Sequence, residues 1–275
     1  MITNNYNILD SILFMEHLNY IKVNLFLMYK KLIEYKFNMF NVILLQIFYV
    51  GTQMIFFFLI SDIFADVVSW TFVDYMLYSF FLDILFQIAG TLSWGKFLTS
   101  ELKSGNFQLL LNKPGNPLFK YLFGNFFSTS VLFIFSSMFI LIGFILYNSV
   151  ELFNLGLSLL VFINLIYLWL VTHYFIESLD FYTFGLNMVV FRVYNTATDI
   201  FHRFPAPFFS KFEFKKLFYI FPFFGLGSLF LPLIRNLESF NLMFQWSLVF
   251  GFSVLFTIGV FINWYYGLKK FEAFG

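Results

Sequence analysis

The segment that decides the fold is Lys96 to Tyr121, KFLTSELKSGNFQLLLNKPGNPLFKY, the longest polar interruption in the first two thirds of a chain that is otherwise rich in apolar runs. It contains the turn Ser104-Gly105-Asn106 and, further on, the run Pro114-Gly115-Asn116-Pro117. Turn residues of this kind end a helix, and proline cannot continue one because it has no backbone N–H. Between the two breaks, Phe107 to Leu111 is long enough for one helical turn with an apolar face. We therefore expect a short cytosolic element between two membrane spans, in a position to receive force from a soluble partner.

Composition places the whole chain in a lipid bilayer. Of its 275 residues 60% are hydrophobic and 11% are charged, whereas charged residues make up about a quarter of a soluble domain. The net charge of +1 and the scattered basic residues give no reason to expect nucleic acid. Because the chain has no cysteine, disulfides, thiolate metal ligands and a thiol nucleophile are excluded. The three histidines lie in separate elements, so no metal site is predicted.

Hydrophobic periodicity predicts one all-α polytopic membrane domain over residues 1–275. Residues 8–36 predict an amphipathic helix that lies in the interface. Since about 20 apolar residues cross a bilayer, six spans are predicted over residues 39–60, 70–94, 121–147, 152–176, 217–234 and 243–266. Residues 177–216 carry apolar groups at i, i+3, i+4, i+7 spacing and are predicted as a cytosolic amphipathic segment, with an in-plane or bundle-packing helix that ends at Pro205 and Pro207.

The positions of lysine and arginine give this map its orientation, because basic residues are retained on the cytoplasmic side. With the N-terminus inside, every lysine and arginine except Arg235 falls in a segment predicted to be cytosolic. Arg235 lies between the fifth and sixth predicted spans. The partition predicts that both termini are cytosolic.

Two carboxylates interrupt the second predicted span. Asp74 lies near its outer end, where we expect it to be solvated, and Asp83 lies near the middle of the bilayer. An ionised acid there costs roughly 2.5 to 3.5 kcal/mol on insertion scales, so Asp83 should face the bundle, water or a partner. It is either a relay for a proton or a substrate, or a hydrogen-bonded packing residue, and both remain open. Together with Pro222 and Pro232, which break the fifth span, Asp74 and Asp83 are the candidate pathway residues.

The region from Ile60 to Tyr121 resembles the permeases of type-two ABC exporters. The resemblance is carried by Trp70-Thr71-Phe72-Val73-Asp74, by Ser104-Gly105-Asn106 and by the run from Leu110 to Leu118, LLNKPGNPL. Further matching pieces follow in order along the chain, namely Phe181-Tyr182-Thr183 with Asn187, Arg203-Phe204-Pro205, Phe221-Pro222-Phe223 with Pro232, and Gly267-Leu268-Lys269-Lys270-Phe271-Glu272. Asp83 departs from the pattern.

The resemblance implies a permease that pairs with a second copy or a second permease chain, is driven by separate ATPase subunits, and exports an amphiphilic or bulky molecule. Residues 8–36 would be its elbow helix, and the segment from Pro222 to Pro232 would dip from the outer face and help to close the exit. The loop at residues 96–120 would dock into the ATPase as a coupling helix, with Glu101, Lys103, Gly105, Asn106, Pro114, Asn116 and Pro117 as its candidate residues.

A phosphate-binding loop on this chain is not expected. Gly90 to Lys96, GTLSWGK, has the right spacing, but Phe97 stands where a magnesium-binding hydroxyl belongs, and the glycines close a membrane span instead of following a strand. We therefore expect no enzyme activity and no cofactor on this chain, with ATP and Mg²⁺ bound by the partner.

Two other classes of protein remain as alternatives. The 48 phenylalanines suit an AT-rich organellar gene, which would make the chain a structural subunit of an organellar or respiratory complex in the mitochondrial inner membrane instead of a plasma-membrane permease. An ion-coupled transporter that uses Asp74 and Asp83 would show internal repeats, and the two halves of the sequence show none.

Overall fold

The structure is a computed structural model that describes scattered positions between residues 19 and 34 and then residues 36–63, 70–93, 98–112, 152–182, 186–204, 206–209, 211–235 and 242–272. The regular elements among these residues are all helical. In chain order they are α2 (Lys36–Ile63), α3 (Phe72–Ser93), α4 (Leu98–Ser104), α5 (Asn106–Leu111), α8 (Leu152–Ser178), η1 (Leu179–Phe181), α9 (Leu186–Arg203), η2 (Ala206–Phe209), η3 (Glu213–Ile220), α10 (Pro222–Gly225), η4 (Leu226–Phe230), α11 (Leu231–Ile234) and α12 (Leu242–Glu272).

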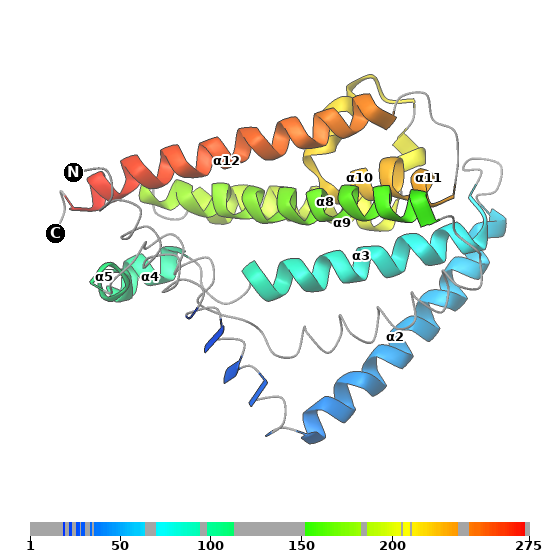
Figure 1. Ribbon diagram of the computed structural model, residues 1–275, viewed down its shortest axis with the longest axis horizontal. Helices are drawn as coiled ribbons and strands as arrows, with labels where there is room; N and C mark the ends of the chain where they lie inside the picture. Colours follow the sequence, from blue (N-terminus) through cyan, green and yellow to red (C-terminus); the bar gives the residue numbers. More distant parts are fainter. Residues whose placement is uncertain are drawn as a thin grey trace, which may run out of the picture.

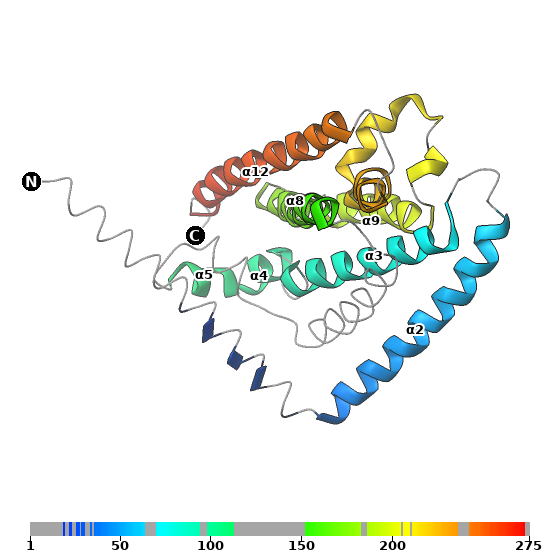
Figure 2. The ribbon, with the colours of Figure 1, turned by 45° about the vertical axis from the view of Figure 1, so that its right-hand side comes forward.

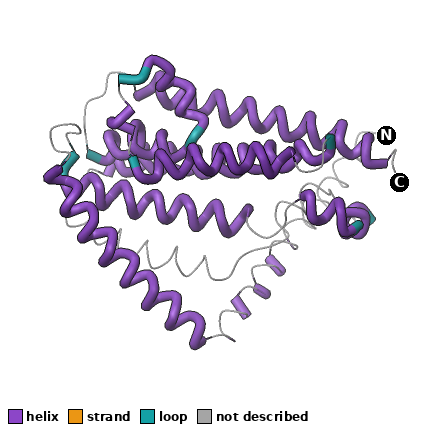
Figure 3. Tube along the Cα trace, turned by 180° about the vertical axis from the view of Figure 1, so that it is seen from behind, coloured by secondary structure: helices purple, strands orange, loops and turns teal. Residues whose placement is uncertain are grey.

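Three long helices, α3, α8 and α12, lie side by side and give the bundle two ends (Figure 1). Helices α4 and α5 and the end of α12 lie at one end, which we call the α4 end. Residues Glu213–Ile234, which we call the bent segment, lie at the other end beside the starts of α3 and α12 (Figures 1 and 2). Helix α2 contacts α3 at the end of the bundle where the bent segment lies, and it diverges from α3 toward the α4 end (Figures 1 and 3).

Helix α3 is the centre of the bundle. Every residue from 74 to 85 is buried, which is expected of a helix that is apolar on all sides. The Phe81 ring packs against Phe230 of the bent segment and Phe162 of α8, with ring centroids 4.1 and 5.3 Å away. One helix therefore contacts both α8 and the bent segment.

Helices α8 and α12 pack along their length through small and polar residues. Tyr167 and Thr257 are hydrogen-bonded at 2.8 Å, and the Asn263 amide donates to the Ser178 hydroxyl at 3.0 Å. At the α4 end, a Cβ atom at Gly267 would clash with the ring of Phe181. Gly267 is therefore required for the close approach of α12 to η1.

Replacing Gly267 by alanine should destabilise the protein, because Phe181 is buried and cannot move without disturbing its own contacts. Overpacking of this kind costs typically about 1–3 kcal/mol. Gly251→Ala is the matched control in the same helix, since the described structure places no atom within 4 Å of its Cβ. Thermal unfolding in detergent should show a lower midpoint for Gly267→Ala alone. Equal midpoints for the two variants would contradict the packing.

Two segments of the described chain, Asn154–Phe181 and Leu242–Lys270, are long and apolar enough to cross a membrane. They coincide with the fourth and sixth predicted spans, and α2 and α3 cover the ranges of the first and second. The fifth predicted span, 217–234, is not one straight helix: Glu213–Ile220 and Pro222–Ile234 meet at a bend of 113°, as in a broken span or a re-entrant loop. The third predicted span and most of the amphipathic helix at 8–36 lie outside the described residues.

Of the two placements predicted for the helix within residues 177–216, in the membrane plane or packed into the bundle, the structure shows the second. Helix α9 starts beside the end of α8 and runs back along it, so that Tyr194 packs against Trp169 and Phe201 reaches Tyr78 of α3. Apolar periodicity could not reveal this, because a helix that packs into a bundle has the same spacing as one that lies on a surface.

This placement also changes the charge partition. The Lys216 amine lies 5.4 Å from the centre of the Phe244 ring at the start of α12, and Lys211 and Lys215 belong to the same stretch. These lysines therefore share an end of the bundle with Arg235, and not with Lys103, Lys269 and Lys270. The basic residues consequently give weaker support to the orientation than the sequence suggested.

Candidate functional site

A glycine joins the two short helices at the α4 end. Gly105 has φ = 75°, the left-handed region that glycine adopts without steric cost. The Gln108 N–H donates to the Gly105 carbonyl at 3.1 Å, so that α5 begins directly after the turn. The turn predicted at Ser104-Gly105-Asn106 therefore separates two helices, and both lie within the predicted coupling loop.

The inner face of this pair is fixed to the bundle by apolar contacts. Leu98, Leu102 and Phe107 are buried. The Phe107 ring lies 5.7 Å from Phe181 of η1 and 6.0 Å from Trp264 of α12, and these two rings lie 5.2 Å apart. A displacement of α4 and α5 must therefore move the ends of α8 and α12 with it.

The opposite face is open. Lys103, Gly105 and Asn106 are exposed, Glu101 is half-buried, and Leu109 is 62% exposed. Four of the predicted coupling residues thus come together on one small element, whereas Pro114, Asn116 and Pro117 lie outside the described residues. Sequence reasoning missed Leu109. The signal was its position two residues after Phe107, which places the two side chains on opposite sides of a short helix.

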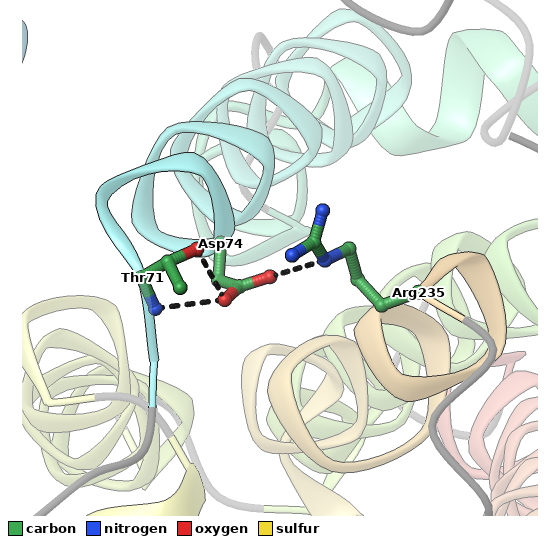
Figure 4. Close-up of polar contacts among 3 residues, drawn as sticks. All are labelled: Thr71, Asp74 and Arg235. Atoms are coloured by element: carbon green, nitrogen blue, oxygen red, sulfur yellow. Dashed lines mark hydrogen bonds and ion pairs between the residues drawn. The ribbon is translucent and has the colours of Figure 1, made fainter. Parts of the chain in front are cut away.

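At the other end of α3, Asp74 caps the helix (Figure 4). Its Oδ2 accepts hydrogen bonds from the Thr71 backbone N–H at 2.8 Å and from the Thr71 hydroxyl at 2.7 Å. The bond to the Thr71 N–H is the half of a capping box in which an acid at the third helical position reaches back to the N-cap residue, and the Thr71 hydroxyl adds a second bond to the same oxygen. Asp74 therefore defines where α3 begins.

The same carboxylate holds the bent segment. The Arg235 Nε lies 2.8 Å from Asp74 Oδ1, with side-chain exposures of 31% and 6% respectively, and Arg235 directly follows α11. The expectation that Asp74 is solvated is wrong, because Asp74 is buried. The sequence held a sign of the pair, since Arg235 was the only basic residue predicted on the side of Asp74.

A tyrosine of α3 contacts both α9 and the second half of the bent segment. The Tyr78 hydroxyl donates to the Phe201 carbonyl at 2.6 Å and also lies 3.4 Å from the Phe223 carbonyl. Helix α3 thus contacts α9 and α10 through Tyr78 and the residue after α11 through Asp74. Pro222 and Pro232, the predicted pathway prolines, lie in the first turns of α10 and α11.

The fourth predicted pathway residue, Asp83, lies apart from the other three. It is buried in α3, and its Oδ1 accepts a hydrogen bond from the Tyr49 hydroxyl of α2 at 3.1 Å. The structure therefore joins Asp74 to the bent segment and Asp83 to the contact between α2 and α3.

Helix α9 has a polar edge on its exposed side. Arg192, Thr196 and Asp199 are exposed and follow i, i+4, i+7 spacing, whereas the exposed residues on the neighbouring edge, Val189 and Val193, are apolar. Charged residues of membrane helices face a water-filled cavity or a partner more often than lipid. This edge is a second feature that the sequence did not single out.

The all-helical fold and the apolar candidate spans define an integral membrane protein. The chain matches the family model described as ABC-2 family transporter protein over residues 47–275. It therefore belongs to the ABC-2 family of transporter proteins, as the resemblance of the sequence implied. No curated protein and no solved structure shows significant similarity to it. The match favours a transporter over a structural subunit of a respiratory complex.

Proposed function

We propose that the chain is the permease subunit of an ATP-driven exporter and that separate ATPase subunits, which bind ATP and Mg²⁺, move it. The observation that carries this proposal is the position of α3. Only residues 94–97 separate it from α4, whose outer face is open, and its other end contacts Phe223 within the bent segment and Arg235 directly after it. A movement of α4 and α5 would thereby reach the far end of the bundle along α3.

We further propose that the α4 end and both termini face the cytosol and that six helices cross the bilayer. Helix α9 replaces residues 217–234 as the fifth span. With 18 residues it is about 27 Å long, close to the thickness of the hydrocarbon core, about 30 Å. The bent segment then dips into the outer face and closes the exit, and residues 8–36 form the elbow helix.

The exposed polar edge of α9 supports a second permease chain, either an identical copy or a relative. Within a single chain this edge would face lipid, where charged residues are unfavourable. Between two chains it would line the path of the exported molecule. The plasma membrane is the proposed location, with the mitochondrial inner membrane as the alternative.

Isolation of the full chain from its native membrane tests this function. An affinity-tagged chain, solubilised in mild detergent, should carry with it a protein that contains a phosphate-binding loop, and the isolated assembly should hydrolyse ATP. Vanadate, which arrests phosphoryl transfer, serves as the control for the hydrolysis. Reproducible isolation of the chain without any ATPase, or with electron-transport subunits instead, would overturn the proposal.

A further inference from the structure

Asp83 is the most unusual polar residue of α3 because half of its carboxylate has no partner. The residue is 7% exposed, and its neighbours from Phe80 to Leu85 are otherwise apolar. Oδ1 accepts the hydrogen bond from Tyr49, whereas Oδ2 is buried and has no hydrogen-bond donor in the described structure. A buried acceptor without a donor is unfavourable, and more so when it is charged.

The described helices that contact this part of α3 provide no cation to complete the site. Helix α3 has no basic residue, and the basic residue of α2 is Lys36, which lies about 20 Å along the helix from Tyr49. Helix α8 has His173 only, and that ring is hydrogen-bonded to the Trp169 carbonyl at 2.9 Å and packed against Phe191 and Tyr194. Arg235 is engaged by Asp74. Among the residues that the structure describes, Asp83 therefore differs from Asp74, which is paired with Arg235.

Access to Asp83 is possible beside Tyr49. Helices α2 and α3 are in contact at the end of the bundle where the bent segment lies. There the ring centroids of Phe57 and Tyr75 lie 5.6 Å apart and those of Phe58 and Phe72 lie 6.1 Å apart. The two helices diverge toward the α4 end (Figures 1 and 3). Tyr49 is 40% exposed, so its ring lies between Asp83 and the surroundings of the bundle. Tyr49 is thus the partly exposed residue that is bonded to the buried carboxylate in the described structure.

We propose that Asp83 and Tyr49 form a binding site for an apolar organic cation, such as the protonated amine of an amphiphilic molecule. The carboxylate provides the counter-charge, and the tyrosine ring provides an aromatic face to which such a cation is attracted. One carboxylate and one phenol are too few oxygen ligands for calcium or magnesium, which take about six or more. The inference rests on the proposed export function, for which it names the class of cargo.

Tetraphenylphosphonium, a lipophilic cation, is the probe that tests this site. The full chain is placed in nanodiscs of neutral phosphatidylcholine, and binding is measured at equilibrium. Because a charge-assisted contact is lost, Asp83→Asn should weaken binding about tenfold or more, whereas Asp83→Glu should restore most of it. Tyr49→Phe should have a smaller effect, since the ring remains. Glu213→Gln, which removes an exposed carboxylate from η3, is the matched control and should bind as the parent chain does.

A measurement on the unmodified chain keeps the test independent of folding defects. Tetraphenylborate has the same shape and the opposite charge, so it should show no specific binding when it is measured alone. Absence of specific cation binding, equal binding to Asp83→Asn, or specific binding of tetraphenylborate would each overturn the site. The assay contains no ATPase, so its failure would leave the coupling proposal intact, and loss of the ATPase partner would leave a positive binding result intact.

Discussion

Replacing Leu109 by aspartate is expected to detach the ATPase from the chain without disturbing the membrane fold. Leu109 is exposed, whereas Leu98, Leu102 and Phe107 of the same helix pair are buried against the bundle. A charge in the centre of an apolar contact should remove about 2 kcal/mol or more of binding free energy, as at other interface hot spots. This corresponds to a loss of about 30-fold in affinity. The measurement is the amount of ATPase that co-purifies with the chain, together with the ATP hydrolysis of the assembly.

The same element provides the controls. Leu109→Met keeps an apolar side chain of similar volume and should retain the partner. Glu101→Ala combined with Lys103→Ala should weaken coupling less than Leu109→Asp, because exposed charges contribute little to a contact. An unchanged yield of ATPase with Leu109→Asp would remove Leu109 from the interface, and an unchanged yield with all of these variants would show that α4 and α5 are not the docking element.

The second large effect is expected at the other end of α3, where Arg235→Ala should destabilise the bent segment more than Asp74→Asn. Loss of Arg235 leaves the Asp74 carboxylate buried without its counter-charge, at a cost of about 1–3 kcal/mol or more. Loss of the Asp74 charge leaves a guanidinium that is 31% exposed and can bind water. Thermal unfolding in detergent, and export once the cargo is known, should show this order.

The stability of the double variant, Asp74→Asn with Arg235→Ala, tests whether the two residues interact. Because Asp74→Asn removes the stranded charge, the protein with both substitutions should be more stable than Arg235→Ala alone. Lys211→Ala, which removes an exposed cation from the same end of the bundle, should leave stability unchanged. Strict additivity of the two substitutions would mean that the ion pair contributes nothing to the attachment of the bent segment.

The sequence predicted the positions of the helices along the chain better than it predicted which helices pack against one another. The runs at 39–60, 70–94, 152–176 and 243–266 correspond to α2, α3, α8 and α12 within a few residues, because a long apolar run in lipid has helix as its stable conformation. For the helix within residues 177–216 the sequence left an in-plane and a bundle-packing placement open, for a physical reason. Once a helix packs into a bundle, its polar edge can face a cavity or a second chain, and a single sequence does not distinguish this from water at a surface.

In the candidate site, too, local features were predictable from the sequence and contacts between distant residues were not. The turn at Gly105 was predictable because glycine and asparagine mark a local break, and the structure confirms that a helix ends there. The exposure of Leu109, the Asp74–Arg235 pair and the Tyr78 contacts depend on residues that are far apart in the chain. Asp83 was recognised from its charge in an apolar run, whereas its hydrogen bond to Tyr49 needed the packing of α2 on α3.

The central claim is that α4 and α5 are the cytosolic contact through which an ATPase moves this chain. The chain has no cysteine, so Leu109→Cys and Met243→Cys, the latter at an 84% exposed position at the start of α12, each introduce a single thiol at opposite ends of the bundle. In intact cells, a membrane-impermeant maleimide should label position 243 only. A thiol-reactive photo-crosslinker added to permeabilised membranes should join position 109, and not position 243, to a protein with a phosphate-binding loop. Labelling of position 109 from outside, or capture of the ATPase from position 243 instead, would contradict the account.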